Sequence, residues 1–134
     1  MNKIKFTRYW DKLNDPDFTT IRSWNPGKET YYRSCMGSEF QVWKARDRYP
    51  FRPEHVIHHA WLHSVKDLAP GDLPDALIKK DICYHGEADQ EWLNKILKMD
   101  KVLLLGFSKY QKPVQLKIED ITGNDAAYRV EVSK

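Results

Sequence analysis

Apolar and polar residues alternate in several short segments of the chain, which is the pattern of strands with one buried face. The alternation is clear at residues 4–6 and 39–46, and extended segments are also expected at residues 18–24 and 56–65. Residues 102–107 are apolar throughout. A short apolar run without alternation predicts a strand that is buried on both faces.

Two segments in the second half of the chain have the period of an amphipathic helix. For the first helix, at residues 73–81, Asp72 is the expected N-cap and Pro74 lies in the first turn, where proline is tolerated. For the second, at residues 87–99, the apolar positions form one face and lysines lie near the C-terminus, where the helix dipole favours them. The sequence therefore predicts two helices between the middle and the late strands.

Asparagine, aspartate, glycine and proline gather at the places where the chain is expected to turn. Turns are predicted at residues 14–17 and 25–27, and a loop at residues 48–53, which contain two prolines. Residues 31–33 fit a short extended piece or a single helical turn.

The order of these elements indicates an α+β fold built on a small mixed β-barrel or a curled sheet. Alternating residues around 114–118 and 128–132 flank a polar turn and predict a C-terminal hairpin. With that hairpin the chain has about six strands, and the helices do not alternate with them. A doubly wound parallel sheet, which requires such alternation, is excluded.

Composition narrows the class of protein. The chain has 134 residues, 41% of them hydrophobic and 13% aromatic, which suits one folded domain rather than a disordered chain. The longest apolar run is too short to cross a bilayer, and the N-terminus lacks the apolar block of a signal peptide. Cys35 and Cys83 have no CxxC partner, which favours a reducing compartment. We therefore expect a cytoplasmic protein without membrane contact.

The net charge of +3 is small but unevenly distributed. Residues 1–67 contain 12 Lys and Arg against 8 Asp and Glu, whereas residues 68–134 contain 10 against 11. Residues 22–52 also hold seven aromatic side chains among their basic ones. Guanidinium groups beside flat rings can hold phosphates and stack bases, which indicates RNA or, second, single-stranded DNA as a partner. The alternative is a mixed surface whose rings face the core.

One set of motifs resembles the ASCH domain, a member of the PUA-like superfamily. The motif residues are Thr19-Thr20-Ile21-Arg22, then Tyr31 and Tyr32, then Gly37-x-x-Phe40-x-Val42. The resemblance covers residues 4–108. It implies a domain at residues 1–108, with residues 109–134 as an accessory hairpin. It also implies a PUA-like barrel with two to three helices packed at its openings and a role in RNA binding.

The resemblance places Arg22 at the signature arginine of the family, which is expected to line a cleft. Its planar fork suits a bidentate contact with phosphate or a base, and the alternative is a structural ion pair. Trp24 and Tyr32 could stack a base or belong to the core. The predicted nucleic-acid-binding residues are Thr20, Arg22, Trp24, Tyr32, Arg33, Lys44, Arg46 and Arg48.

An enzymatic alternative follows from the same resemblance. One branch of the family removes an acyl group from a modified cytidine with a lysine, a threonine and a glutamate. The threonine corresponds to Thr20 and the acid falls near Asp81, but the lysine position is occupied by Asp17. Because an amine activates the hydroxyl nucleophile in that arrangement, its absence favours binding over catalysis. Another branch resembles a metal-dependent ribonuclease, but no motif of it maps onto this chain.

Four histidines gather at residues 55–63, and Cys83 and His85 follow later. His59 and His63 would be near neighbours on a strand or a helix, which permits a zinc or nickel site. No second pair has the spacing of structural zinc ligands. The interpretation we favour is imidazoles at the rim of the barrel, with no metal and no cofactor.

Overall fold

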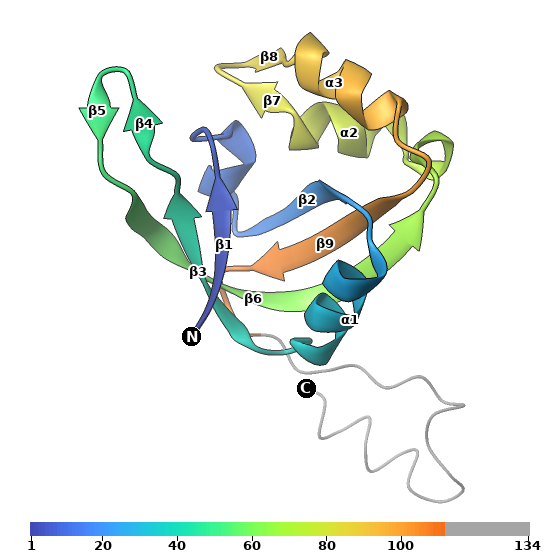
Figure 1. Ribbon diagram of the computed structural model, residues 1–134, viewed down its shortest axis with the longest axis horizontal. Helices are drawn as coiled ribbons and strands as arrows, with labels where there is room; N and C mark the ends of the chain where they lie inside the picture. The colour runs from blue at the N-terminus through green and yellow to red at the C-terminus, as the bar shows by residue number, and fades with distance from the viewer. Residues whose placement is uncertain (112–134) are drawn as a thin grey trace, which may run out of the picture.

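The computed structural model describes residues 1–111, so the predicted C-terminal hairpin lies outside the described residues. Five strands form one curled sheet (Figure 1). They are β1 (Asn2–Phe6), β2 (Asp17–Ser23), β3 (Glu39–Lys44), β6 (His55–Leu68) and β9 (Val102–Ser108). The order across the sheet is β1-β3-β6-β9-β2; β1 runs parallel to β3 and the other neighbours are antiparallel. The predicted α+β class is confirmed.

Strand β9 lies between β6 and β2, and all its residues are buried. Leu103, Leu105 and Phe107 belong to the main core cluster. Val102 and Leu104 face a second cluster, which is completed by α2 (Asp75–Asp81) and α3 (Gln90–Leu97). The prediction of a strand buried on both faces is therefore confirmed, because each face of β9 meets its own cluster.

Helix α1 (Pro26–Ser34) follows β2; only a single helical turn at residues 31–33 was predicted here, as one of two alternatives. The predicted turn at residues 25–27 is in fact the start of this helix. The side chain of Asn25 accepts a hydrogen bond from the backbone N–H of Lys28 at 2.7 Å, and Pro26 stands at the first helical position. Asparagine and proline favour a helix start as well as a turn, so the local signal was ambiguous.

The two predicted helices are present but begin later than expected. Asp72 does not cap α2; it lies in the 3-10 helix η2 (Pro70–Asp72), and Pro74 occupies the N-cap position of α2. The second helix, α3, begins at Gln90, where the Asp89 side chain accepts from the backbone N–H of Trp92 at 2.9 Å.

Two short hairpins lie outside the five-stranded sheet (Figure 1). One is formed by β4 (Asp47–Arg48) and β5 (Phe51–Arg52), where a loop was predicted. Each strand is only two residues long, because Pro50 and Pro53 have no backbone N–H to donate to a ladder. The other is formed by β7 (Cys83–Tyr84) and β8 (Glu87–Ala88), directly before α3. The carboxylate of Asp11 accepts from the backbone N–H groups at its turn, which fixes this hairpin to the 3-10 helix η1 (Asp11–Asn14).

The sheet is not closed into a barrel by hydrogen-bonded ladders. Within the described residues, β1 and β2 are its two edges and no ladder joins them. Side chains link them instead: Arg22 on β2 donates from Nη2 to the backbone oxygen of Lys5 on β1 at 2.9 Å, and Phe6 on β1 contacts Phe18 on β2 edge-on.

Candidate functional site

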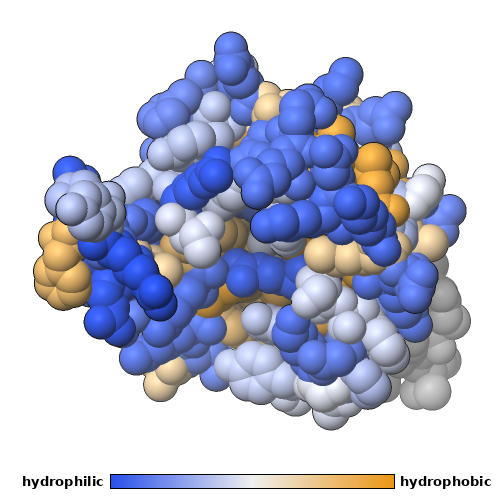
Figure 2. All heavy atoms as spheres, turned by 45° about the horizontal axis from the view of Figure 1, so that its top comes forward, coloured by the Kyte–Doolittle hydropathy of each residue, from blue (hydrophilic) through white to orange (hydrophobic). Residues whose placement is uncertain are grey.

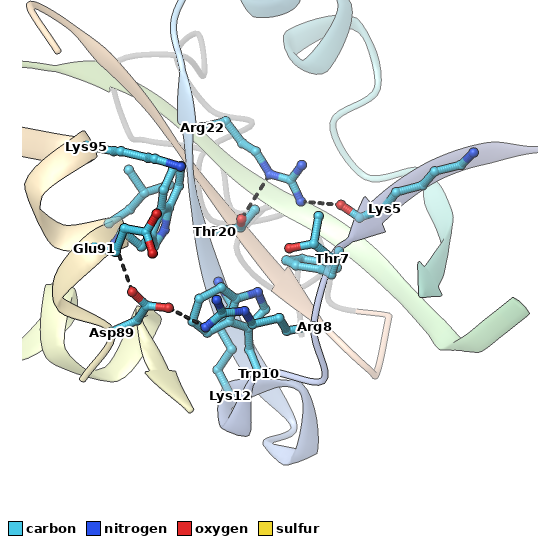
Figure 3. A pocket seen from close by; sticks show the side chains of 13 residues that line it. Lys5, Thr7, Arg8, Trp10, Lys12, Thr20, Arg22, Asp89, Glu91 and Lys95 are labelled. Atoms are coloured by element: carbon cyan, nitrogen blue, oxygen red, sulfur yellow. Dashed lines mark hydrogen bonds and ion pairs between the residues drawn. The ribbon is translucent and has the colours of Figure 1, made fainter. Parts of the chain in front are cut away.

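A pocket of about 330 Å³ opens between the two edge strands, η1 and α3 (Figure 3). Its volume is at the lower end of the range for small-ligand sites. The pocket is lined by Lys5, Phe6, Thr7, Arg8, Trp10, Lys12, Thr20, Ile21, Arg22, Asp89, Glu91, Trp92 and Lys95.

Thr20 and Arg22 lie two positions apart on β2, so their side chains lie on the same face of the strand. Arg22 donates from Nε to Oγ1 of Thr20 at 3.1 Å, and its guanidinium lies over the ring of Phe6, 4.7 Å from the centroid. Burial lowers the pKa of Arg22, although an arginine remains protonated in proteins. The guanidinium is thus held in a fixed orientation at the pocket wall by two neutral acceptors, Thr20 and the backbone oxygen of Lys5.

Beside the pocket lies a buried ion pair. Lys12 on η1 and Asp81 at the end of α2 are 4% and 2% exposed, and Lys12 donates from Nζ to Oδ1 of Asp81 at 2.9 Å. The same carboxylate accepts from the hydroxyl of Thr19 at 3.1 Å and from the backbone N–H of Ile21 at 3.3 Å. Asp81 therefore satisfies an edge-strand N–H of β2 and fixes η1 and α2 to that strand. Burial lowers the pKa of Lys12.

The opposite wall is formed by the start of α3. Asp89 caps this helix and forms an ion pair with Arg8 (Figure 3). The bond from the backbone N–H of Trp92, together with Arg8, holds the pKa of Asp89 below its ordinary value. Trp92 presents its ring to the pocket, and Lys95 follows one turn later.

The cations of the pocket differ in how they are neutralised. Lys5 pairs with Glu54 at 2.9 Å, Lys12 pairs with Asp81, and Arg8 pairs with Asp89. Within the described residues, no carboxylate forms an ion pair with Arg22 or Lys95, because none approaches their nitrogens within 4.0 Å. An anion entering the pocket would therefore meet two cations that lack a carboxylate partner.

Of the residues predicted from the sequence, the structure brings Thr20 and Arg22 into the pocket and places Asp81 directly behind it. Trp24 and Tyr32 do not line the pocket; both pack against the main core cluster. The indole N–H of Trp24 donates to Glu29 at 2.7 Å, and Tyr32 stacks on Phe40 with centroids 6.2 Å apart.

The remaining predicted cations are also outside the pocket. Arg33 is bound by Glu29 and Asp67 on the side of α1. Lys44 is 4% exposed and donates to Asp47 at 2.7 Å. Arg46 and Arg48 are exposed on the hairpin formed by β4 and β5.

Arg8, Lys12, Trp92 and Lys95 line the pocket but were not among the predicted site residues. Trp92 was assigned to the apolar face of its helix, which is correct but incomplete, since its ring also borders the pocket. Nothing in the local sequence around Lys12 distinguishes it from a surface lysine. Only the tertiary contact with Asp81, 69 positions away, shows its role.

The histidines are distributed over separate contacts. His55 bonds to the hydroxyl of Tyr9, His58 to the backbone oxygen of Leu13, and His59 to Glu39. In the part of the chain that the structure describes, no three histidine, cysteine or acidic side chains come together to hold a metal ion. The helices of that part are also too short and too polar to cross a membrane.

Comparisons with protein-family models, curated proteins and solved structures found no match to this chain. The resemblance to ASCH domains therefore stays a prediction that rests on the motif residues themselves.

Proposed function

We propose that this protein binds single-stranded nucleic acid, RNA first, by taking one nucleotide into the pocket between β1, β2 and α3. The observation that carries the proposal is Arg22: its guanidinium is fixed at the pocket wall by neutral acceptors and has no carboxylate partner among the described residues. A planar cation held in this way suits a phosphate or the edge of a base. We also propose that the curled sheet is a PUA-like barrel of the ASCH type.

The pocket offers both kinds of contact that a nucleotide needs. Lys95 on α3 and Arg22 on β2 provide positive charge from two sides, and Trp92 provides a ring on which a base can stack. The volume of about 330 Å³ suits one small ligand rather than a duplex.

Fluorescence anisotropy with labelled single-stranded RNA at low salt tests this proposal. We expect Arg22→Lys, which keeps the charge but removes the fork, to weaken binding by about 1–3 kcal/mol. Lys95→Ala should weaken binding of all sequences by a smaller amount, while Lys98→Ala, an exposed lysine at the end of the same helix, should bind as the wild type does. Circular dichroism verifies that each variant is folded. Absence of wild-type binding to both RNA and single-stranded DNA would refute the proposal.

A second candidate function is hydrolysis of an acylated nucleoside, and one observation favours it. Asp17 occupies the lysine position of the family branch that this chain resembles, but Lys12 from another element borders the same pocket as Thr20 and is bonded to Asp81. Burial lowers the pKa of Lys12, so its ammonium gives up a proton more readily than that of an exposed lysine, and the resulting amine could accept the proton of the Thr20 hydroxyl. The reaction would consume one water and release a carboxylic acid and cytidine.

This candidate is tested with cytidine acylated on its exocyclic amine, followed by ultraviolet absorbance. We expect Thr20→Val to abolish turnover without unfolding the protein, since valine keeps the shape of the side chain. If the wild type leaves the acylated cytidine intact, the hydrolase candidate is wrong and the binding proposal is unaffected.

A further inference from the structure

The hairpin formed by β4 and β5 stands away from the body of the protein (Figure 1). We call residues 46–54 the arm. Tyr49 at its tip is 100% exposed, and Phe51 beside it is 67% exposed. Rings this exposed bury little apolar surface against the domain, so their contribution to folding is small.

The arm is also basic. Arg46, Arg48 and Arg52 are all exposed, and no ion pair of theirs within 4.0 Å is found in the described part of the chain. Asp47, the acidic residue between two of them, is already bound by Lys44 at 2.7 Å. The arm therefore presents cations and flat rings together, in a form that is available to a partner.

The root of the arm is fixed. Lys44 is buried at the end of β3, donates to Asp47 and to the backbone oxygen of Ala45, and lies over the ring of Tyr9, 5.4 Å from its centroid. Lys44 thus acts as a positioning residue that sets the direction of the arm, although the sequence suggested that it would contact phosphate.

The arm and the pocket are connected by two contacts. Lys5, which lines the pocket, forms its ion pair with Glu54 at the end of the arm. Tyr9 bonds to Nε2 of His55 at 2.5 Å, directly after the arm, and the neighbouring Arg8 lines the pocket. Figure 2 shows the arm standing beside the hollow on the same face of the molecule. The arm and the pocket therefore lie beside each other on one face and are held together by these contacts.

We propose that the arm binds the nucleotides that flank the one in the pocket, so that the full ligand is a single-stranded RNA segment rather than a mononucleotide. This inference rests on the proposed function. Exposed rings can stack only on bases that are not already stacked in a duplex, and the arginines can hold the adjoining phosphates. A second copy of this chain fits the arm less well, because two arms would bring like charges together.

The test compares a dinucleotide with a strand of about twelve nucleotides, a length within the range that single-strand-binding sites cover. Binding of both to the wild type and to the double variant Tyr49→Ala/Phe51→Ala is measured by anisotropy. We expect the wild type to bind the longer strand at least about tenfold more tightly, and the double variant to lose that gain while binding the dinucleotide unchanged. Tyr31→Ala, an exposed tyrosine on α1 away from the arm, is the matched control and should keep the gain.

The possible failures are distinguishable. If the double variant binds the longer strand as tightly as the wild type, the arm inference is wrong and the pocket proposal stands. If the wild type binds neither RNA, both are wrong. Sedimentation velocity on the same proteins tests the alternative that a second copy of this chain binds the arm. A wild-type dimer that becomes monomeric in the double variant would identify the arm as a self-association surface and overturn the inference.

Discussion

The buried group formed by Lys12, Asp81 and Thr19, which we call the polar centre, and the arm are two charged regions of the same small domain, but their charges have different surroundings. In the polar centre, Lys12 and Asp81 are almost completely buried and bonded to each other, and Asp81 also holds Thr19 and the backbone of Ile21. On the arm, Arg48 and Tyr49 are exposed to solvent.

The difference shows that the burial of a charge determines whether the charge affects stability or ligand binding. A buried charge must keep its partner, because the loss of either group leaves the other in a medium that cannot solvate it. An exposed charge contributes little to stability and stays available for a ligand. Substitutions in the polar centre should therefore change folding, whereas substitutions on the arm should change binding alone.

The largest expected effect is that of Asp81→Ala. The change leaves the Lys12 ammonium buried without its carboxylate and removes the acceptor of Thr19 and Ile21. We expect the free energy of unfolding to fall by about 3–5 kcal/mol, measured by urea denaturation.

The double variant Lys12→Met/Asp81→Leu is the control for this change. It replaces both charges by apolar groups, so it should be less destabilised than Asp81→Ala. A double variant as unstable as the single one would show that the bonds to β2, and not the buried charge, determine the effect.

Trp24→Ala comes next and tests which region this ring belongs to. Trp24 packs against the core and Lys101 lies over its ring at 4.4 Å, so we expect a loss of about 1–3 kcal/mol in stability. RNA affinity of the folded variant should stay unchanged. A folded variant that no longer binds RNA would instead assign Trp24 to the interface.

The third prediction concerns pH. Burial lowers the pKa of His58, whose ring contacts Phe18 edge-on. Below about pH 6.5 the unfolded chain takes up a proton that the folded imidazole resists. Stability should therefore fall with acidification through this group, by less than about 1 kcal/mol because the ring keeps some solvent contact.

His58→Gln isolates that contribution, since the other titrating groups are the same in both proteins. The difference in unfolding free energy between the wild type and the variant should change between pH 7 and pH 5. A constant difference over that range would show that His58 titrates as it does in the unfolded chain.

The smallest effect on stability is expected for Arg48→Ala, within about 0.5 kcal/mol of the wild type. Its RNA affinity should weaken for all sequences alike, and the slope of log K against log salt should flatten by about 0.7. Arg33→Ala is the matched control, because Glu29 and Asp67 already bind that guanidinium. An unchanged salt slope in Arg48→Ala would show that this arginine does not contact phosphate.

The elements that could be predicted are those whose signal is contained in a few consecutive residues. Strand β9 is apolar at every position but the last, and α3 repeats its apolar residues with the helical period. Helix α1 was missed because Asn25 and Pro26 begin a turn as readily as a helix, and α1 has no buried residue to show a periodic pattern.

The candidate site could be predicted only in part, for the same physical reason. Thr20 and Arg22 share one strand and one motif, and the structure places both in the pocket. Lys12 and Asp81 meet across 69 positions, and Arg8 and Asp89 across 81. Such pairs depend on how η1 and the helices pack, which no local pattern specifies.

The place of β9 between β6 and β2 also bears on how the chain folds as it is synthesised. Strand β2 is made early, yet the strand that pairs with it is β9, whose residues are added some eighty positions later. Until β9 leaves the ribosome, the ladder between β1, β3 and β6 ends at an unpaired edge, and β2 has no strand with which to pair. Non-local pairings of this kind are slow to form, and unpaired edges attract other chains. The nascent protein therefore depends on its last described strand to pair β6 and β2, and this part of the sheet forms late.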